Sequence, residues 1–294
     1  MNMLGDMGLT DDVNTLVTNG AVSGRVVKRR LGSDPSQRYY LYVPHHCPVD
    51  APLLVSVHGI SRNARKHIRR FVGLAERYGV VVVAPLFEQE RYPDYQRLGL
   101  VGERADLMLK KIVAEVERLT AANSRQLYLF GYSGGGQFVH RYAMAHPAEV
   151  AAVAIGAAGW YTFPDPERRF PHGLRAHSRL PDLVFNPEAF LRIPVCVLVG
   201  EADTVRDAAL RQGARIDRRQ GYSRFERGQR WIEAMTALSQ QYGLATEFRF
   251  VALSDADHSF TRSVRSGGMD EQLFSYLFGS APEVVVPGFT PHIV

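Results

Sequence analysis

The feature that most constrains the fold is an alternation of short apolar runs with longer segments of helical periodicity. The runs have the length of buried strands and occupy residues 52–59, 79–85, 125–131, 150–159, 194–200 and 246–253. In the segments between them, apolar residues recur at i, i+3, i+4 and i+7, as at Ile68, Phe71, Val72 and Ala75. Apolar runs separated by helices are typical of a mostly parallel sheet that helices cover on both faces. The pattern therefore predicts the α/β class.

The remaining segments indicate how this sheet begins and what interrupts it. Residues 26–44 alternate in polarity and predict an antiparallel hairpin at the start, and a single short helix is expected after the last strand. Residues 160–193 are rich in proline and predict an irregular cap between two strands. No linker or internal repeat divides the chain, so we expect a single domain over 1–294 with a core of about 22–280 and a proline-rich tail at 281–294.

Charge and cysteine content exclude several classes of protein. The chain carries 35 Lys and Arg against 30 Asp and Glu, and this net charge of +5 predicts an ordinary solvated surface. The arginines of 206–230 lack the interleaved aromatic residues of nucleic-acid-binding modules, so we expect no nucleic-acid partner. They favour a solvated helix face over an anion site. Cys47 and Cys196 cannot form a disulfide framework.

Targeting segments and metal-binding motifs are not evident in the sequence. It shows neither an export signal nor a run of about 18–20 apolar residues, so we expect a cytoplasmic protein without a membrane partner. Its ten histidines are scattered, without an H-E-x-x-H motif or a cluster with cysteine, so we expect no metal and no other cofactor. The sequence leaves the oligomeric state open.

Four glycines surround a single serine in the stretch GYSGGG, residues 131–136. The spacing fits neither a P-loop nor a dinucleotide-binding fingerprint, but it fits G-x-S-x-G. In that motif a strand turns sharply into a helix, and glycines two before and two after the serine remove Cβ clashes. Here the motif follows the apolar run 125–131 and opens a helical segment, which is the context that the motif requires. It predicts Ser133 as an exposed nucleophile.

A nucleophilic serine needs a base, an acid that orients the base, and donors for the oxyanion. Asp203 follows the run 194–200, and His258 follows the run 246–253, so both are expected at the carboxyl ends of strands. Asp255 and Asp257 are alternative acids, but they lie in the histidine's own loop, which makes the required geometry harder. The run 52–59 ends in His-Gly, where a backbone N–H suits an oxyanion, and the N–H of Gly134 is the second expected donor.

Taken together, these residues resemble the α/β-hydrolases over about residues 22–280. YLYVP at 40–44, PLLVSVHG at 52–59, GYSGGG and the compact cap resemble polyhydroxybutyrate depolymerase-like and feruloyl esterase-like esterases in particular. The resemblance implies an eight-stranded, mostly parallel sheet with helices on both faces, a short cap, and hydrolysis of a carboxylic ester. It implies Ser133, Asp203 and His258 as the catalytic triad. It implies the backbone N–H groups of Ile60 and Gly134 as the oxyanion hole.

The sequence thus predicts a serine esterase that forms an acyl-enzyme with a small-molecule ester. One alternative is an amide or peptide hydrolase with the same triad, although the large extra domain of prolyl-peptidase relatives is not present in the sequence. The other alternative is a catalytically silent member of the fold that binds a ligand or a partner, against which the complete set of triad residues argues.

Aromatic residues near the predicted strand ends indicate what the substrate contacts. Trp160, Tyr161 and Phe163 follow the run 150–159, and Tyr95 lies in a long loop after 79–85. We expect them to line a shallow pocket that accepts a short acyl or aryl ester, because the cap is short for shielding a long lipid chain. Arginines near such a cleft could bind a substrate carboxylate.

Overall fold

The computed structural model describes residues 23–120 and 122–279, and the predicted tail at 281–294 lies outside them. Eight strands form one open sheet in the spatial order β1-β2-β4-β3-β5-β6-β7-β8. Their bounds are β1 Val27–Leu31, β2 Asp34–Tyr42, β3 Pro52–Val57, β4 Val81–Leu86, β5 Asn123–Tyr132, β6 Val150–Gly156, β7 Val195–Gly200 and β8 Phe248–Leu253.

The first two strands form the predicted hairpin, and β2 also runs antiparallel to β4. All the other pairings are parallel, from β4 with β3 through to β7 with β8. Because parallel strands end at the same edge of a sheet, the loops that follow β3, β5, β7 and β8 meet there. The eight-stranded, mostly parallel sheet that the resemblance implies is confirmed.

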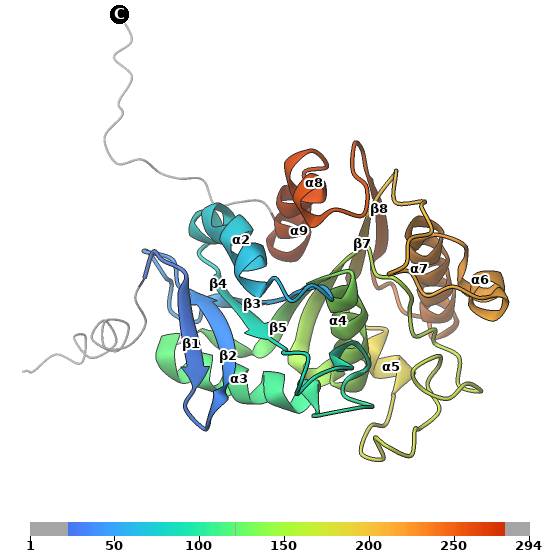
Figure 1. The fold of residues 1–294 in the computed structure, drawn as a ribbon, viewed down its shortest axis with the longest axis horizontal. Coiled ribbons are helices and arrows are strands. Elements are labelled where there is room, and N and C mark those ends of the chain that lie inside the picture. Colours follow the sequence, from blue (N-terminus) through green and yellow to red (C-terminus); the bar gives the residue numbers. More distant parts are fainter. Residues whose placement is uncertain (1–22, 121, 280–294) are drawn as a thin grey trace, which may run out of the picture.

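Helices cover both faces of the sheet (Figure 1). On one face α2 packs beside α9, and the bidentate ion pair of Arg77 with Glu271 joins these two helices. On the other face α3, α4 and α7 lie along the strands, with α6 outside α7. The helix bounds are α2 Ala64–Tyr78, α3 Ala105–Thr120, α4 Gly134–Ala145, α5 Pro187–Phe190, α6 Ala214–Gln220, α7 Arg224–Gln241, α8 Phe260–Arg265 and α9 Met269–Phe278. None of the helices in the described ranges is long and apolar enough to cross a membrane.

Local sequence explains where the main helices begin, end and bury their faces. Ile68, Phe71 and Ala75 of α2 are fully buried, as their spacing predicts, and the helix ends at Gly79 in the left-handed conformation that glycine accepts most readily. Helix α7 begins at the N-cap Ser223, whose side chain accepts a hydrogen bond from the N–H of Glu226 at 3.2 Å, while the Glu226 carboxylate accepts from the N–H of Tyr222 at 2.7 Å.

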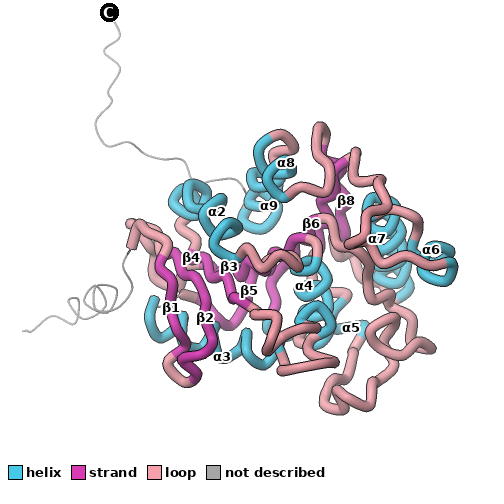
Figure 2. Tube along the Cα trace, in the orientation of Figure 1, coloured by secondary structure: helices cyan, strands magenta, loops and turns pink. Residues whose placement is uncertain are grey.

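Two predictions about organisation need refinement. The single C-terminal helix is two helices, because the chain turns at Gly267–Gly268 between α8 and α9. The arginine-rich segment contains a separate short helix, α6, before the predicted Trp231 helix, which is α7. The segment 160–193, which was predicted to be an irregular cap, consists of loops and isolated bridges apart from α5 (Figure 2).

Candidate active site

Ser133 is the single residue between β5 and α4, and its backbone has a conformation that residues other than glycine rarely adopt. Its φ of 55° and ψ of −112° place it in a strained region for a residue with a Cβ atom. Two backbone hydrogen bonds hold the turn: the N–H of Ser133 donates to the carbonyl oxygen of Gly156 at 2.7 Å, and its carbonyl accepts from the N–H of Gln137 at 3.1 Å. The strain directs the Ser133 side chain out of the sheet edge at the start of a helix.

The two glycines of the motif are required by close backbone approach. A Cβ on Gly131 would lie 2.2 Å from the carbonyl oxygen of Gly135, and a Cβ on Gly135 would lie 2.0 Å from the carbonyl oxygen of Val57. Both distances are far below van der Waals contact with backbone atoms that cannot move aside. The glycines therefore let the start of α4 press against β5 and β3, as the sequence motif predicts.

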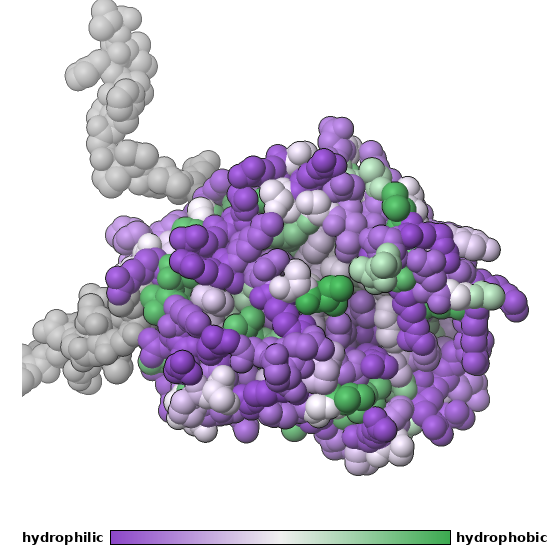
Figure 3. Space-filling view, viewed as in Figure 1, coloured by the Kyte–Doolittle hydropathy of each residue, from purple (hydrophilic) through white to green (hydrophobic). Residues whose placement is uncertain are grey.

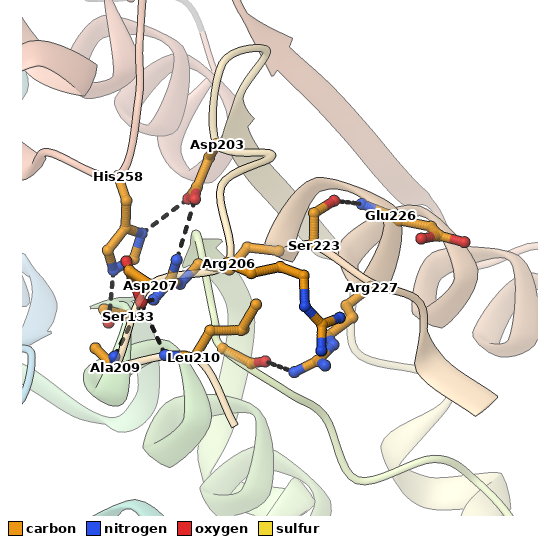
Figure 4. A network of polar contacts seen from close by, with 12 residues as sticks. Ser133, Asp203, Arg206, Asp207, Ala209, Leu210, Ser223, Glu226, Arg227 and His258 are labelled. Carbon is orange, nitrogen blue, oxygen red and sulfur yellow. Dashed lines mark hydrogen bonds and ion pairs between the residues drawn. The ribbon is translucent and has the colours of Figure 1, made fainter. Parts of the chain in front are cut away.

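His258 and Asp203 complete a line of side chains that starts at Ser133 (Figure 4). His258 Nε2 lies 3.1 Å from Ser133 Oγ, and His258 Nδ1 lies 2.8 Å from Asp203 Oδ2. The Asp203 carboxylate is only 1% exposed, and the imidazole is 21% exposed. The structure thus brings the three residues together in the geometry of a nucleophile, a base and an orienting acid.

Contacts between the loops after β7 and β8, and the ring of Tyr132, hold His258 in place. The N–H of Ala202 donates to the carbonyl oxygen of Ala256 at 3.0 Å, so the loops after β7 and β8 are joined next to the site. A Cβ on Gly200 would lie 2.2 Å from that same oxygen, which explains a glycine at the end of β7. The ring of Tyr132 stacks on the His258 imidazole, with 5.6 Å between ring centroids.

Arg224 is a part of this site that the sequence reasoning missed. Its guanidinium is 1% exposed and binds Asp203 Oδ1 at 3.3 Å and Asp207 Oδ1 at 2.8 Å. The prediction of a solvated arginine face is therefore wrong for Arg224, and also for the fully buried Arg227. A buried cation beside Asp203 offsets the cost of keeping that carboxylate ionised and holds its second oxygen. No local signal in the sequence marks Arg224 as buried, because its partners Asp203 and Asp207 come from another segment of the chain.

The alternative acids in the histidine loop point elsewhere. Asp257 Oδ2 pairs with Arg262 at 2.8 Å, and the carboxylate of Asp255 lies in an exposed turn with a positive φ of 56°. Neither forms a hydrogen bond with the His258 ring among the described residues. Of the three aspartates considered, Asp203 is the one placed to orient His258.

The loop after β3 places a backbone N–H next to the nucleophile. A Cβ on Gly59 would lie 3.5 Å from Ser133 Cβ, and one on Gly134 would lie 3.3 Å from the backbone nitrogen of Ile60. Gly134 is the first residue of α4, so its own N–H has no acceptor within the helix. The N–H groups of Ile60 and Gly134 are thus close neighbours at the serine, where the resemblance implies an oxyanion hole.

Hydrogen bonds of His58 and Tyr95 hold the loop after β3 in place. His58 Nδ1 lies 2.8 Å from the carbonyl oxygen of Gly59, and His58 Nε2 lies 3.0 Å from the backbone nitrogen of Phe87, so the neutral ring donates to the former and accepts from the latter. Tyr95 donates its O–H to the carbonyl oxygen of His58 at 2.8 Å. The Tyr95 side chain is fully buried, which corrects its predicted role as a substrate contact. Its role is to support the loop that carries Ile60.

Cap aromatics also differ from the prediction. Tyr161 is fully buried and stacks on Trp231, with 5.0 Å between centroids, so it packs the cap onto α7 and is not available to a substrate. Trp160 is 6% exposed because Arg141 and Arg211 lie over its ring, at 4.2 and 4.8 Å from the centroid. Phe163 is half-buried and lines a pocket under the cap.

Three buried histidines make the stability of the fold sensitive to acid. Burial lowers the pKa of His58 to about 4 and that of His67 to about 3, and it lowers the pKa of His140 well below the ordinary value. The unfolded chain binds protons to these histidines near pH 6.5, whereas the folded chain does so only at much lower pH. Their contribution to stability is therefore complete above about pH 6.5 and is lost as the pH falls toward 4.

We expect His67→Phe to reduce this acid sensitivity. His67 stacks flat on Phe260, with 3.9 Å between centroids, and its Nδ1 is buried without a partner among the described residues, so a phenyl ring fits the site. Between pH 7 and pH 5 the free energy of unfolding of the wild type should fall by about 2 kcal/mol more than that of the variant. Denaturant unfolding at both pH values measures this. His46→Phe, at an exposed histidine, should keep the wild-type pH dependence; an equal change in both variants would contradict the assignment.

No group of three or more His, Cys, Asp or Glu residues in 23–120 and 122–279 is arranged to hold a metal ion. The side chains that line up at Ser133 are a serine hydroxyl, an imidazole and a carboxylate.

Comparison with known proteins identifies the fold. No protein-family model matches the chain, and no curated protein matches it in sequence at a significant level. Among solved structures, it is similar to poly(aspartic acid) hydrolase-1 from Sphingomonas sp. KT-1, with 21% identity, a TM-score of 0.73, and coverage of 87% of this chain and 99% of that one. It is similar to a poly(3-hydroxybutyrate) depolymerase from Bordetella parapertussis, with 25% identity, a TM-score of 0.71, and coverage of 89% and 92%.

A third similar structure is an S-formylglutathione hydrolase from Agrobacterium tumefaciens, with 16% identity, a TM-score of 0.56, and coverage of 86% of this chain and 95% of that one. The other matches include a serine hydrolase and an esterase, at 11% and 17% identity, and these likenesses show the fold. Three observations indicate the same fold: the strand order, the serine turn between β5 and α4, and the likeness over nearly nine tenths of the chain. The chain has the α/β-hydrolase fold.

Proposed function

We propose that this protein is a serine hydrolase that cleaves a carboxylic ester through an acyl-enzyme. The observation that carries the proposal is the continuous line from Ser133 Oγ to His258 Nε2 at 3.1 Å and from His258 Nδ1 to Asp203 at 2.8 Å, on a strained turn. A strained backbone at a serine costs stability and is a recognised feature of nucleophile turns. The poly(3-hydroxybutyrate) depolymerase among its neighbours supports the ester as the substrate class.

The proposed reaction has two steps with balanced proton movements. His258 Nε2 takes the hydroxyl proton of Ser133 as Oγ attacks the ester carbonyl, and the N–H groups of Ile60 and Gly134 stabilise the oxyanion. The imidazolium then gives this proton to the leaving alkoxide, which leaves as the alcohol and the acyl-enzyme remains. In the second step His258 takes a proton from water, the hydroxide attacks the acyl carbon, and the proton returns to Ser133 as the acid is released.

Asp203 supports both steps without taking a proton. It accepts the hydrogen bond from His258 Nδ1–H, which keeps the proton on Nδ1 and leaves Nε2 free to act as the base. Arg224, which Asp207 holds by a second ion pair, binds the other oxygen of the carboxylate and so helps to orient Asp203 toward His258.

Amide hydrolysis by the same residues remains the second candidate chemistry, and a silent binding protein the third. A matched pair of substrates separates the first two: p-nitrophenyl butyrate and p-nitrobutyranilide carry the same acyl group and release chromophores at an ester and an amide bond. We expect turnover of the ester and at most a trace with the anilide. A pre-steady-state burst of p-nitrophenol equal to the enzyme concentration would support the acyl-enzyme, and no turnover of either substrate would favour the silent binder.

The size of the acyl group is the next prediction. Polar side chains cover most of the face in Figure 3, and apolar residues form small, separate patches on it, so this face has no broad apolar surface for a lipid aggregate. We expect kcat/KM for unsubstituted p-nitrophenyl esters to be highest at two to four acyl carbons and to fall for longer chains. A chain-length series measured below the critical micelle concentration checks this. A maximum at twelve carbons or more would contradict the expected shallow site.

A further inference from the structure

A pocket of about 1110 Å³ lies between the cap and the segment that runs from the loop after β7 into α6 and α7. We call it the cap pocket. Six arginines line it: Arg168, Arg169 and Arg175 from the cap, and Arg211, Arg215 and Arg219 from the α6 side. Two carboxylates, Asp165 and Glu167, also line it. The pocket is therefore strongly basic, and its cations stand on two walls that are about 40 residues apart in the sequence.

Most of these arginines have no counter-charge. Arg168 pairs with Asp165 at 2.8 Å. The other five form no ion pair with any carboxylate of residues 23–120 and 122–279, whereas the neighbouring Arg206, Arg224 and Arg227 all do. Burial, and after it the charges of four arginines, lowers the pKa of His172 in the pocket wall to about 4; the four are Arg211, Arg141, Arg215 and Arg168. Cations that the fold gathers without an anion repel one another, so a bound anion would stabilise the pocket.

Packed side chains lead from the cap pocket to α4, the helix that begins next to Ser133. The loop that carries Asp203 at its start carries Arg211 near its end, and the Arg211 guanidinium lies over Trp160. The guanidinium of Arg141 also lies over that ring. Arg141 is two turns along α4 from Ser133 and fully buried, with one guanidinium nitrogen unpartnered among the described residues. A Cβ on Gly159 would touch the side chain of Gln137, one turn or ~6 Å along α4 from Ser133. The basic wall is thus linked through Trp160 to the helix that starts at the serine.

A second basic pocket lies at the start of α2. It has a volume of about 590 Å³ and follows Ile60 directly in the sequence; its cations are Arg62, Arg65, Lys66, Arg69 and Arg70. None of these five is ion-paired with a carboxylate in the described ranges either. Positive charge without a paired carboxylate among the described residues thus lies at the start of α2 and around the cap, which would attract an anionic substrate from solution.

We propose that the cap pocket binds carboxylate groups of the substrate, so that the preferred ester carries carboxylates at a distance from the bond that is cleaved. The proposal rests on the hydrolase function proposed above. Guanidinium groups bind carboxylates with paired hydrogen bonds, and six of them on two walls suit several single charges spaced along a substrate better than one compact phosphate. The pocket volume, in the range of sites for small molecules, leaves room for such a chain.

The test compares esters that differ only in a terminal charge. Mono-p-nitrophenyl esters of linear dicarboxylic acids with six, eight, ten and twelve carbons are assayed beside the p-nitrophenyl esters of the monocarboxylic acids of equal length. We expect kcat/KM of the carboxylate ester to exceed that of its neutral partner about tenfold or more at one chain length, and this advantage to disappear in 0.5 M NaCl. Equal values for both members of every pair would overturn the proposal.

Variants locate the effect in the cap pocket. The double change Arg215→Gln with Arg219→Gln should remove most of the advantage of the carboxylate ester, by about tenfold in kcat/KM, and leave the neutral ester unchanged. The matched control is Arg218→Gln, because Arg218 is exposed on the same short helix but does not line the pocket. Equal losses in the pocket variant and the control would show a general charge effect and contradict the assignment.

The two proposals fail separately in this design. If the wild type cleaves neutral esters in a manner that requires Ser133 but shows no preference for charge, the hydrolase function stands and the carboxylate proposal falls. If no ester of either kind is cleaved, the hydrolase function itself falls. Octanedioate should compete with the preferred ester, whereas inorganic phosphate at the same ionic strength should not; competition by phosphate alone would assign the pocket to a compact anion and overturn the proposal.

Discussion

Ser133→Ala should abolish labelling by a fluorophosphonate probe and lower kcat for p-nitrophenyl butyrate by a factor of about 10⁴ to 10⁶. The reason is that the variant removes the atom that forms the covalent bond in both steps, and the other members of a triad cannot act alone. Residual activity over water would come from the oxyanion donors and from binding. Gel fluorescence after labelling and steady-state kinetics measure the two effects independently.

The control for this experiment is Ser254→Ala, which changes an exposed serine in the turn before His258 and should keep wild-type labelling and rate. Alanine keeps a Cβ at residue 133, so the strained turn and the fold should persist, and thermal unfolding of the variant checks that they do. Esterase activity that is unchanged in Ser133→Ala would eliminate the proposed mechanism. Labelling that persists in this variant would place the reactive nucleophile at another residue.

Asp203→Asn should lower kcat by about 10³- to 10⁴-fold near pH 7. An amide at residue 203 can donate to Nδ1 and thereby favour the tautomer with its proton on Nε2, which can no longer accept the proton from Ser133. The buried Arg224 would also lose one of its two carboxylate partners, so a part of the effect should appear as lower stability. Kinetics and denaturant unfolding of the same preparation separate the two contributions.

Asp257→Asn is the matched control for this prediction, because it makes the same chemical change one residue from His258 and removes only a partly exposed pair with Arg262. We expect its kcat to stay within about twofold to threefold of wild type. The neutral amide of Asp203→Asn no longer favours the tautomer that the base requires. The activity that this variant retains should therefore increase toward higher pH, because hydroxide then contributes to the reaction. Equal losses in Asp203→Asn and Asp257→Asn would reopen the identity of the orienting acid.

The features that sequence alone predicted are those with a local physical cause. Glycines at 131 and 135 are needed because backbone atoms approach within 2.2 Å of the positions where Cβ atoms would lie. The spacing of these glycines around Ser133 is visible in the sequence. The apolar runs predicted the strands because a strand whose two faces are both covered by helices carries apolar residues on both faces. Asp203 and His258 were predictable because parallel strands end at one edge, so their order along the chain already predicts that they lie near Ser133.

Tertiary structure decided everything that depends on which segment covers another. The residue pattern around Tyr161 and Tyr95 indicated aromatic side chains near the strand ends, but only the packing of the cap on α7, and of Tyr95 beneath the Ile60 loop, shows that neither reaches a substrate. Arg224 is equally charged in sequence whether it is solvated or buried. It is buried because a loop from another part of the chain brings Asp203 and Asp207 to its guanidinium, and periodicity within one helix carries no information about that partner.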